Sequence, residues 1–273
     1  MSLLDDHVVL IVGGGSGLGL GVARYFLTEG AKLAILEISK EKADALREEF
    51  GAGVLVRQGD ATSIADLEAT RDAIVDRFGR LDAYVGCQGI FDGNIPLQDT
   101  PLDKVPDLFD EVFHVNVLAY VLGARVFYPE LAKTGGAIVL TASVAAFAAD
   151  GGGLFYTASK GAVKSIVNQL SFEFSPSVRV NGVAPAGIAN SQLRGPAALG
   201  LEHHKQSDIP KDAFLKLFRE VSTLPELPTP EDHGPLYAFL ASRHNKIMTG
   251  TTVLADQGSL NRAFLSQPAA PER

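Results

Sequence analysis

The sequence predicts a single-domain α/β protein with a doubly wound parallel sheet of about seven strands and helices on both faces. Short β-branched runs alternate with helical segments along almost the whole chain, a pattern typical of such a sheet. A glycine-rich turn follows the first run directly. The 273 residues, of which 46% are hydrophobic, are enough for one sizeable core, so residues 1–273 are expected to form one domain.

The amino-terminal part of the chain alternates regularly between strands and helices. The expected strands are 8–12, 32–36, 54–57 and 81–85. A helix is expected from Leu18 to Glu29, where Gly30 ends it. Ser39 is expected to cap a helix that runs through Phe50, and Thr62 or Ser63 the next one.

The carboxyl-terminal part is less regular. Further strands are expected at 137–140, 178–183 and 252–254, and helices at 105–133 and from near 156 to 174. Residues 187 to about 220, whose first part is rich in Gly, Pro, Ser, His and Lys, are expected to form a substrate loop or lid. The tail at 266–273 is expected to be mobile.

Composition argues against several classes of protein. The formal net charge is −8 and no basic stripe is present, which argues against nucleic acid as a partner. No apolar run reaches the roughly 20 residues of a membrane span, and the start of the chain does not resemble a signal peptide. The single cysteine excludes an internal disulfide. We therefore expect a soluble cytoplasmic protein.

The glycine-rich turn has the context of a dinucleotide site. It lies between the first strand and the first helix, where glycines allow the backbone to approach a pyrophosphate and the helix N-terminus favours its charge. A turn with a purely structural role is the alternative, but the acidic residue about 20 positions on favours a cofactor. The residues of this turn expected to bind it are Gly13, Ser16, Gly17, Leu18 and Gly19.

Two acidic residues follow the next strands. Glu37 is placed to accept hydrogen bonds from the adenosine ribose and to repel a 2′-phosphate, which favours NAD over NADP. Its alternative role is that of a solvated loop carboxylate. Asp60, with Ala61 beside it, is expected to contact the adenine because ligands lie beyond the carboxyl ends of such strands. The alternative for Asp60 is to cap the next helix.

A serine, a tyrosine and a lysine form the candidate catalytic set. Tyr156 and Lys160 are four residues apart on a predicted helix, which places them on one face, and Ser143 follows a strand. A tyrosine has an ordinary pKa of about 10, and nearby cations favour its phenolate. Tyr156 would then take the hydroxyl proton while hydride leaves for NAD, Ser143 would hold the substrate oxygen, and Lys160 would also bind the nicotinamide ribose.

These residues resemble the short-chain dehydrogenase/reductase family over nearly the whole chain. The matching pieces are Gly13-x3-Gly17-x-Gly19, Asp60, Asn116, Ser143, Tyr156-x3-Lys160 and Arg179-Val180-Asn181. The resemblance implies a Rossmann-type sheet, a homotetramer, and a role for Asn116 in holding a water that links the lysine to a proton relay. A polar group capping a distorted helix is the alternative for Asn116.

Other stretches resemble the bacterial cis-dihydrodiol dehydrogenases of arene degradation, such as the biphenyl and phenylpropionate enzymes. They are Leu36–Ser39, Phe109–Val117, Gly151–Tyr156 and Leu193–Pro196. The implied reaction is the NAD-dependent oxidation of a cis-dihydrodiol to a catechol, which aromatisation favours. Phe91, Phe147 and Phe155 are candidates for the walls of a ring pocket, with core packing as the alternative for each.

The sequence departs from the family pattern near the cofactor. Cys87-Gln88-Gly89 stands where the family usually has Asn-Ala-Gly. Gln88 and Gly89 are expected to lie against the cofactor, with Gln88 either bonding on the adenosine side or narrowing the pocket. Pro185-Ala186-Gly187-Ile188 replaces the commoner Pro-Gly. Pro185 and Ile188 are still expected at the cofactor, with the Ile188 backbone facing the carboxamide.

Three further features favour ordinary structural roles. His203 and His204 are adjacent on the expected loop, without a third ligand suitably spaced, so a metal site is not expected. Cys87 is expected to be a small core residue rather than a reactive thiol. The charged run from Lys40 to Glu49 is expected to be a solvated helix face.

Two other functions remain open. The first is a secondary-alcohol dehydrogenase or ketoreductase with a different substrate, which Glu37 disfavours only in its NADP-dependent form. The second is a non-catalytic protein that binds NAD on the same fold. Such a protein is expected to lack part of the catalytic set, whereas Asn116, Ser143, Tyr156 and Lys160 are all present.

Overall fold

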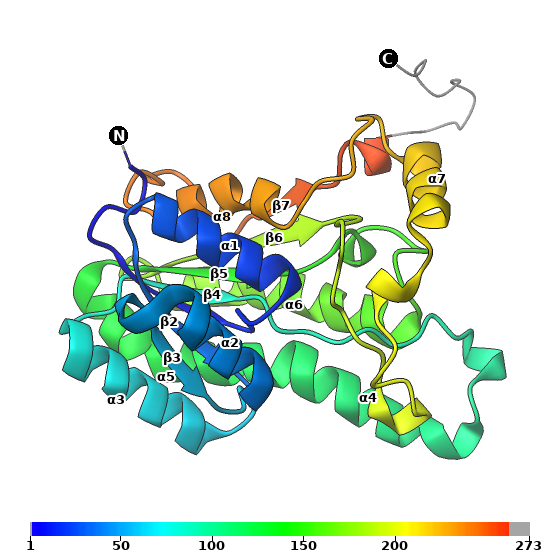
Figure 1. Cartoon of the computed structure of the whole chain (residues 1–273), viewed down its shortest axis with the longest axis horizontal. Coiled ribbons are helices and arrows are strands. Elements are labelled where there is room, and N and C mark those ends of the chain that lie inside the picture. Colours follow the sequence, from blue (N-terminus) through cyan, green and yellow to red (C-terminus); the bar gives the residue numbers. More distant parts are fainter. Residues whose placement is uncertain (1, 262–273) are drawn as a thin grey trace.

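The computed structural model describes residues 2–261 and shows one seven-stranded sheet. Every strand pair is parallel, and the strand order is β3-β2-β1-β4-β5-β6-β7 (Figure 1). The strands are β1 (Val8–Val12), β2 (Lys32–Glu37), β3 (Leu55–Gln58), β4 (Ala83–Gly86), β5 (Ala137–Thr141), β6 (Arg179–Pro185) and β7 (Thr252–Ala255). The predicted fold class is confirmed, and every predicted strand is present within two residues of its expected bounds.

Helices cover both faces of the sheet, as continuous apolar strands require. The helices are α1 (Gly17–Thr28), α2 (Lys40–Phe50), α3 (Ile64–Phe78), α4 (Val105–Phe113), α5 (Ala119–Thr134), α6 (Leu154–Glu173), α7 (Lys211–Val221) and α8 (Gly234–Ala241). Buried side chains of α1, α2 and α8 pack on one face. Those of α3, α5 and α6 pack on the other. Ser39 and Ser63 cap α2 and α3 as predicted, with hydroxyls that accept from Lys42 and Asp66.

The predicted long helix is interrupted by one π-helical turn. α4 and α5 are joined by the segment His114–Leu118, which is wound as a π-helix. The whole stretch Leu102–Thr134 is long and apolar enough to cross a membrane by length and composition alone. It is instead a core helix, because Tyr120, Ala124, Phe127 and Leu131 are buried in the cluster beneath the sheet.

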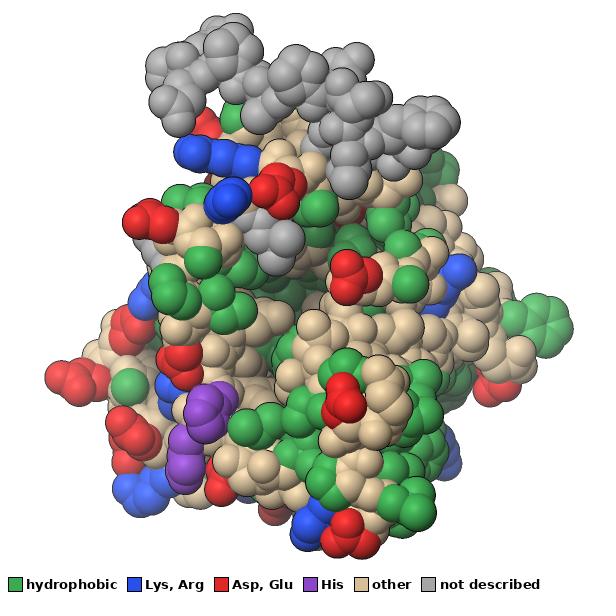
Figure 2. Space-filling view, turned by 90° about the vertical axis from the view of Figure 1, so that its right-hand side faces the viewer, with side chains coloured by type: hydrophobic (Ala, Val, Ile, Leu, Met, Phe, Trp, Pro, Cys, Tyr) green, Lys and Arg blue, Asp and Glu red, His purple; other side chains and the backbone are tan. Residues whose placement is uncertain are grey.

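Two helices were not predicted from the sequence. α8 is short and mostly buried against α1 and the sheet. α7 forms the end of the expected substrate loop and places Phe218 inside the molecule. The face that carries α7 is hollowed, and hydrophobic side chains gather around the hollow (Figure 2). The predicted mobile tail at 266–273 lies outside the described residues.

The rest of the expected loop folds back on itself. Arg194 and Lys205 form an isolated antiparallel bridge, and the backbone N–H of Gly195 donates to the carbonyl of His204 at 2.9 Å. Glu111 of α4 fixes this segment by accepting from the backbone N–H groups of Ala197 and Ala198 and by pairing with Arg194 at 3.2 Å. The segment after β6 is therefore an ordered structure tied to α4.

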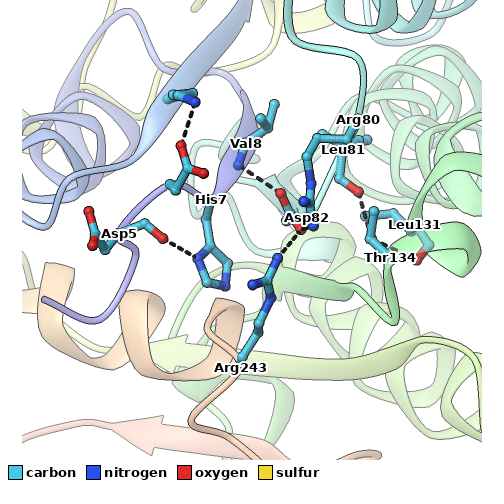
Figure 3. Close-up of polar contacts among 11 residues, drawn as sticks. Asp5, His7, Val8, Arg80, Leu81, Asp82, Leu131, Thr134 and Arg243 are labelled. Carbon is cyan, nitrogen blue, oxygen red and sulfur yellow. Dashed lines mark hydrogen bonds and ion pairs between the residues drawn. The ribbon is translucent and has the colours of Figure 1, made fainter.

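The amino-terminal edge of the sheet is held by a buried carboxylate. Asp82 precedes β4, and its Oδ2 accepts from the backbone N–H of Val8 at 3.0 Å. Its other oxygen pairs with Arg80 and, at 3.1 Å, with Arg243, so that three chain segments meet there (Figure 3). His7 lies beside this cluster with a ring nitrogen 3.2 Å from the carbonyl of Asp5, and burial lowers the pKa of His7.

Candidate active site

A cleft of about 1630 Å³ opens at the carboxyl ends of the central strands. It lies where the strand order reverses between β1 and β4, the usual ligand site of such sheets. The volume exceeds the roughly 300–1,000 Å³ of ordinary small-molecule pockets and suits a dinucleotide together with a substrate. All the predicted cofactor residues line it: Gly13, Ser16, Gly17, Leu18, Gly19, Glu37, Asp60, Ala61, Gln88, Gly89, Tyr156, Lys160, Pro185 and Ile188.

The glycine-rich turn forms a tight cradle at the start of α1. Gly13 has a φ of +77°, which favours glycine. A Cβ on Gly19 would lie 2.1 Å from the Gly13 carbonyl oxygen, so only glycine lets the helix pack so closely on the turn. No acidic residue stands in the first turn of α1. The free N–H groups there fit the phosphates of a dinucleotide.

Glu37 ends β2 and faces this cradle from the side. Its side chain is buried, with Oε2 accepting from the Gly15 N–H at 2.9 Å and Oε1 from the Ser39 N–H at 3.0 Å. A Cβ on Gly15 would lie 2.5 Å from Oε2. Glu37 is therefore not a solvated loop carboxylate. Gly15, which was not among the predicted site residues, is what allows this close approach.

Lys42 reaches into the same end of the cleft. Its Nζ donates to the Ser16 hydroxyl at 2.8 Å, and both residues line the cleft. The expectation of a solvated helix face is wrong for Lys42, although it describes Lys40, which pairs with Asp44 at an exposed position. The first turn of α2 faces the glycine-rich turn. The sequence alone does not show this contact, because it depends on how the two segments pack in the fold. The cation is well placed to contact a phosphate or ribose.

Asp60 has a local role as well as a place in the cleft. Its Oδ1 accepts from both the backbone N–H and the hydroxyl of Thr62, at 2.7 and 2.8 Å. Ser63, rather than Asp60, caps α3. The capping alternative is therefore wrong for the helix itself, but Asp60 does order the turn before it.

The candidate catalytic residues converge at the other end of the cleft. Ser143 follows β5, whereas Tyr156 and Lys160 occupy successive turns of α6. All three are buried and line the cleft. The Lys160 ammonium lies 5.6 Å from the centre of the Tyr156 ring and donates to the carbonyl of Thr141 at 2.9 Å. The structure brings together the set that the sequence predicts.

Burial controls the protonation of this set. It raises the pKa of Tyr156 to about 12, although hydrogen bonding with the Ser143 hydroxyl acts in the opposite direction. It also lowers the pKa of Lys160 to about 8. The protein's own groups do not give the lowered tyrosine pKa that the sequence led us to expect, because burial disfavours both charged forms. The positive ring of an oxidised nicotinamide favours the phenolate when the cofactor is bound.

Asn116 lies beneath the site, within the π-helical turn. Its side-chain amide accepts from the Ile90 N–H at 2.8 Å and donates to the Ile90 carbonyl at 2.9 Å. It also donates to the Ser159 hydroxyl at 3.1 Å. The side chain of Asn116 therefore holds the segment after β4 against α6 and does not cap the distorted helix.

Cys87, Gln88 and Gly89, where the sequence departs from the family pattern, follow β4 and line the cleft. Both side-chain amide atoms of Gln88 are buried, and the amide interacts with the hydroxyl of Tyr84. A Cβ on Gly89 would lie 3.5 Å from the Lys160 Nζ. Burial raises the pKa of Cys87 to about 12, which keeps the thiol protonated and unreactive.

The substrate end of the cleft has partly different walls from those expected. Phe91 lines the cleft and packs edge-on against Tyr156, with ring centres 5.1 Å apart. Phe155 packs in a buried cluster with Ile90 and Leu108 instead. Phe147 lies outside the cleft under Lys164. The missed aromatic wall is on α7, where Phe214 and Phe218 line the cleft, as do Ser259 and Leu260 near the end of the described chain.

The lid histidines lie at the rim. His203 lines the cleft and is exposed, 3.8 Å from a carboxylate oxygen of Glu202. Within residues 2–261, no group of three histidine, cysteine, aspartate or glutamate side chains is arranged to hold a metal ion.

A dinucleotide cradle and a Ser-Tyr-Lys set at opposite ends of one cleft define an oxidoreductase that uses a nicotinamide cofactor. The profile of a family described as enoyl-(acyl carrier protein) reductase matches residues 13–259. Together with the relatives below, this match shows that the chain belongs to the short-chain dehydrogenase/reductase family.

Curated relatives match over nearly the whole chain. The 3-phenylpropionate-dihydrodiol/cinnamic acid-dihydrodiol dehydrogenases of Escherichia coli (strain SMS-3-5 / SECEC) and Shigella boydii serotype 4 (strain Sb227) are each 41% identical over 259 residues, or 94% of both chains. The crystal structure of gox2181 superposes with a TM-score of 0.79, covering 95% of this chain and 97% of that one. At 22% identity, that likeness supports the fold alone.

Proposed function

We propose that this enzyme oxidises a cis-dihydrodiol of an aromatic compound to the catechol, with NAD as the hydride acceptor and Tyr156 as the acid/base. The observation that carries the proposal is the convergence of Ser143, Tyr156 and Lys160 on one cleft whose far end holds the Glu37 carboxylate. The relatives that act on dihydrodiols, by their names, support the substrate class.

The cofactor end favours NAD. The Glu37 carboxylate is fixed by two backbone N–H groups, so it is oriented to accept from ribose hydroxyls and opposes a 2′-phosphate. The Gly13–Gly19 cradle fits the pyrophosphate. When bound, NAD supplies the acceptor for the hydride.

The proton chemistry belongs to the chain's own residues. Ser143 holds the substrate hydroxyl, and the Tyr156 oxygen takes its proton as the C–H bond breaks. Lys160, fixed on the Thr141 carbonyl, contacts the nicotinamide ribose and stabilises the phenolate. Asn116 keeps the segment after β4 against α6 and, as the family resemblance implies, binds a water of the proton relay. Aromatisation of the oxidised ring then gives the catechol.

An aromatic substrate suits the other end of the cleft. Phe91 stands beside Tyr156, and Phe214 and Phe218 of α7 supply an apolar wall. A flat ring in this space is within reach of the Tyr156 hydroxyl. The segment 187–220 is the proposed lid that carries the substrate contacts. We also propose a cytoplasmic homotetramer, as in the family.

The test is NADH formation by the purified protein with NAD and a panel of substrates. The panel contains the cis-dihydrodiols of benzene, biphenyl and phenylpropionate together with simple secondary alcohols. Fast oxidation of a dihydrodiol supports the proposal. Turnover of the plain alcohols alone would replace it with a general alcohol dehydrogenase. Cofactor binding without turnover of any substrate would favour a non-catalytic NAD-binding protein.

A further inference from the structure

The helix that carries Tyr156 is capped from a distant part of the chain. Gly153 is the N-cap residue of α6 and has no side chain to serve as a cap. The carboxylate of Asp92, in the segment after β4, takes that place. Its Oδ1 accepts from the Gly153 N–H at 3.1 Å and its Oδ2 from the Tyr156 N–H at 2.9 Å. The cap thus binds the catalytic residue's own backbone.

The glycines next to the Asp92 carboxylate leave room for it. Asp92 is 2% exposed, and its Oδ1 also accepts from the Asn94 N–H at 3.1 Å. A Cβ on Gly153 would lie 2.4 Å from Oδ2 of Asp92. A Cβ on Gly152 would lie 2.5 Å from the Tyr156 ring. The glycines before α6 therefore provide room for both the carboxylate and the ring.

The neighbours of Asp92 contact the same catalytic residues. Phe91 packs edge-on against the Tyr156 ring at 5.1 Å, and Ile90 is held by both ends of the Asn116 amide. Gln88 and Gly89, just before them, line the cofactor end of the cleft. The five residues 88–92 thus join the cofactor site to the first turn of α6.

The charge of Asp92 acts on Tyr156 as well. A carboxylate at a helix N-terminus is stabilised by the helix dipole and by the N–H groups it accepts from. Burial is the main cause of the raised pKa of the Tyr156 hydroxyl, and the negative charge of Asp92 raises that pKa further. Removal of the charge therefore favours the phenolate, whereas loss of the cap disturbs the position of the ring.

We propose that Asp92 is the positioning residue of Tyr156, fixing the first turn of α6 to the segment that lines the cofactor site. This inference rests on the proposed acid/base role of Tyr156. Asp92 itself is not among the residues that line the cleft. It acts through the backbone of Tyr156 and through the charge beside it.

The test compares Asp92→Asn with Asp82→Asn, using whichever substrate the wild-type enzyme oxidises. Asp82 is the control because it is also buried and accepts from a backbone N–H, but at the opposite edge of the sheet, where it also pairs with Arg80 and Arg243. We expect D92N to lower the plateau kcat by about 10- to 100-fold, in the range of a misplaced acid/base. The KM for NAD is expected to stay within about twofold.

The pH profile separates positioning from simple stabilisation. The oxidation rate rises with pH as the Tyr156 phenolate forms. In D92N this rising limb of the pH profile is expected to move to lower pH, because a charge that raises the Tyr156 pKa is removed. D82N is expected to lower the melting temperature and leave that limb unchanged. A D92N variant with wild-type plateau kcat and an unmoved limb would overturn the proposal.

Two further variants keep the outcome decisive. Gly153→Ala retains the charge but displaces the carboxylate, so it is expected to lower the plateau kcat without moving the limb to lower pH. If D92N does not fold, a G153A variant with full activity would overturn the proposal. Tyr156→Phe serves as the reference. If Y156F is fully active, the proposed role of Tyr156 has failed, whereas an inactive Y156F with an unchanged D92N refutes Asp92 alone.

Discussion

The ammonium group of Lys42 lies 2.8 Å from the hydroxyl of Ser16, the residue that precedes the first turn of α1. Ser16 and Lys42 are 26 residues apart in the sequence, and their contact joins the start of α1 to the first turn of α2. It also places a cation at the end of the cleft where the Glu37 carboxylate is held. The cofactor end of the cleft thus carries one anion, the Glu37 carboxylate, and one cation, the ammonium group of Lys42.

We expect Lys42→Met to raise the KM for NAD by about two- to fivefold. A partly exposed cation near a phosphate contributes roughly 0.3–1 kcal/mol. Lys40→Met is the matched control, because Lys40 lies on the same helix and pairs with Asp44 in solvent. Steady-state kinetics with varied NAD measure the difference. Equal KM values for the two variants would remove Lys42 from the cofactor site.

Glu37→Ala is expected to relax the preference for NAD over NADP by about 10- to 100-fold in the ratio of kcat/KM values. A hydrogen bond to a charged group contributes about 1.5–3 kcal/mol, and its loss affects NAD more than NADP. Glu41→Ala, on the exposed face of α2, controls for the loss of an acidic residue nearby. A wild-type enzyme that already prefers NADP would contradict the assignment.

Tyr156→Phe is expected to reduce kcat by about 10²–10⁴-fold, the range for loss of a positioned acid/base. The affinity for NAD is expected to change little, because the ring and its contact with Phe91 are retained. Calorimetric titration of NAD and single-turnover kinetics check the two parts separately. Tyr128→Phe, which alters a ring packed on Phe174 away from the cleft, is expected to keep full activity.

Stability is expected to fall in mildly acidic solution because of His7. Burial lowers the pKa of His7 in the folded state below its ordinary value of 6.5, although the nearby Asp82 acts in the opposite direction and Arg80 and Arg243 act with burial. The unfolded chain therefore binds a proton first as the pH falls below about 6.5. The contribution of neutral His7 to the free energy of unfolding is complete above that pH. It is lost as the pH falls further, by at most about 1.4 kcal/mol per pH unit for one proton.

Denaturant unfolding at several pH values tests the role of His7. His7→Gln is expected to reduce the dependence of the unfolding free energy on pH between about 5 and 7. His203→Gln, at the exposed rim of the cleft, is expected to leave that dependence as it is. His233 is also buried with a lowered pKa, so part of the slope is expected to remain in the His7 variant.

Local patterns were sufficient for most of the sheet and for the catalytic set. The strands are short and bounded by turns, and the central strands β1 and β5 are buried along their whole length, so their signal is strong. The Tyr156 and Lys160 spacing and the glycine-rich turn depend only on neighbouring residues. The structure places these features at one edge because parallel strands end at the same side of the sheet.

The elements that were missed depend on contacts across the fold. α8 is apolar on all sides and begins with Gly-Pro, so it lacks the amphipathic pattern of a surface helix. α7 has that pattern, with Phe214 and Phe218 four residues apart, but it follows a stretch with the composition of a loop. The π-helical turn at Asn116 leaves no mark in hydrophobic periodicity.

The contacts of Asp92 and Lys42 show the same limit. Asp92 lies 64 residues before Tyr156, and its carboxylate binds backbone N–H groups, which every residue type except proline offers. Nothing in the local sequence distinguishes it from a loop aspartate. Lys42 stands within a charged run in which three other residues, Lys40, Asp44 and Arg47, form solvated ion pairs. Only the packing of α2 against the glycine-rich turn separates it from them.

The two ends of the described chain differ in their distance from the candidate active site. Leu260 lines the mouth of the cleft, whereas Leu3 and His7 lie at the amino edge of the sheet, where Asp82 joins its strands. An affinity tag or a surface tether is therefore best attached before Ser2. Immobilised in that orientation, the enzyme presents its open mouth to the solution, and substrate reaches Tyr156 without passing the support.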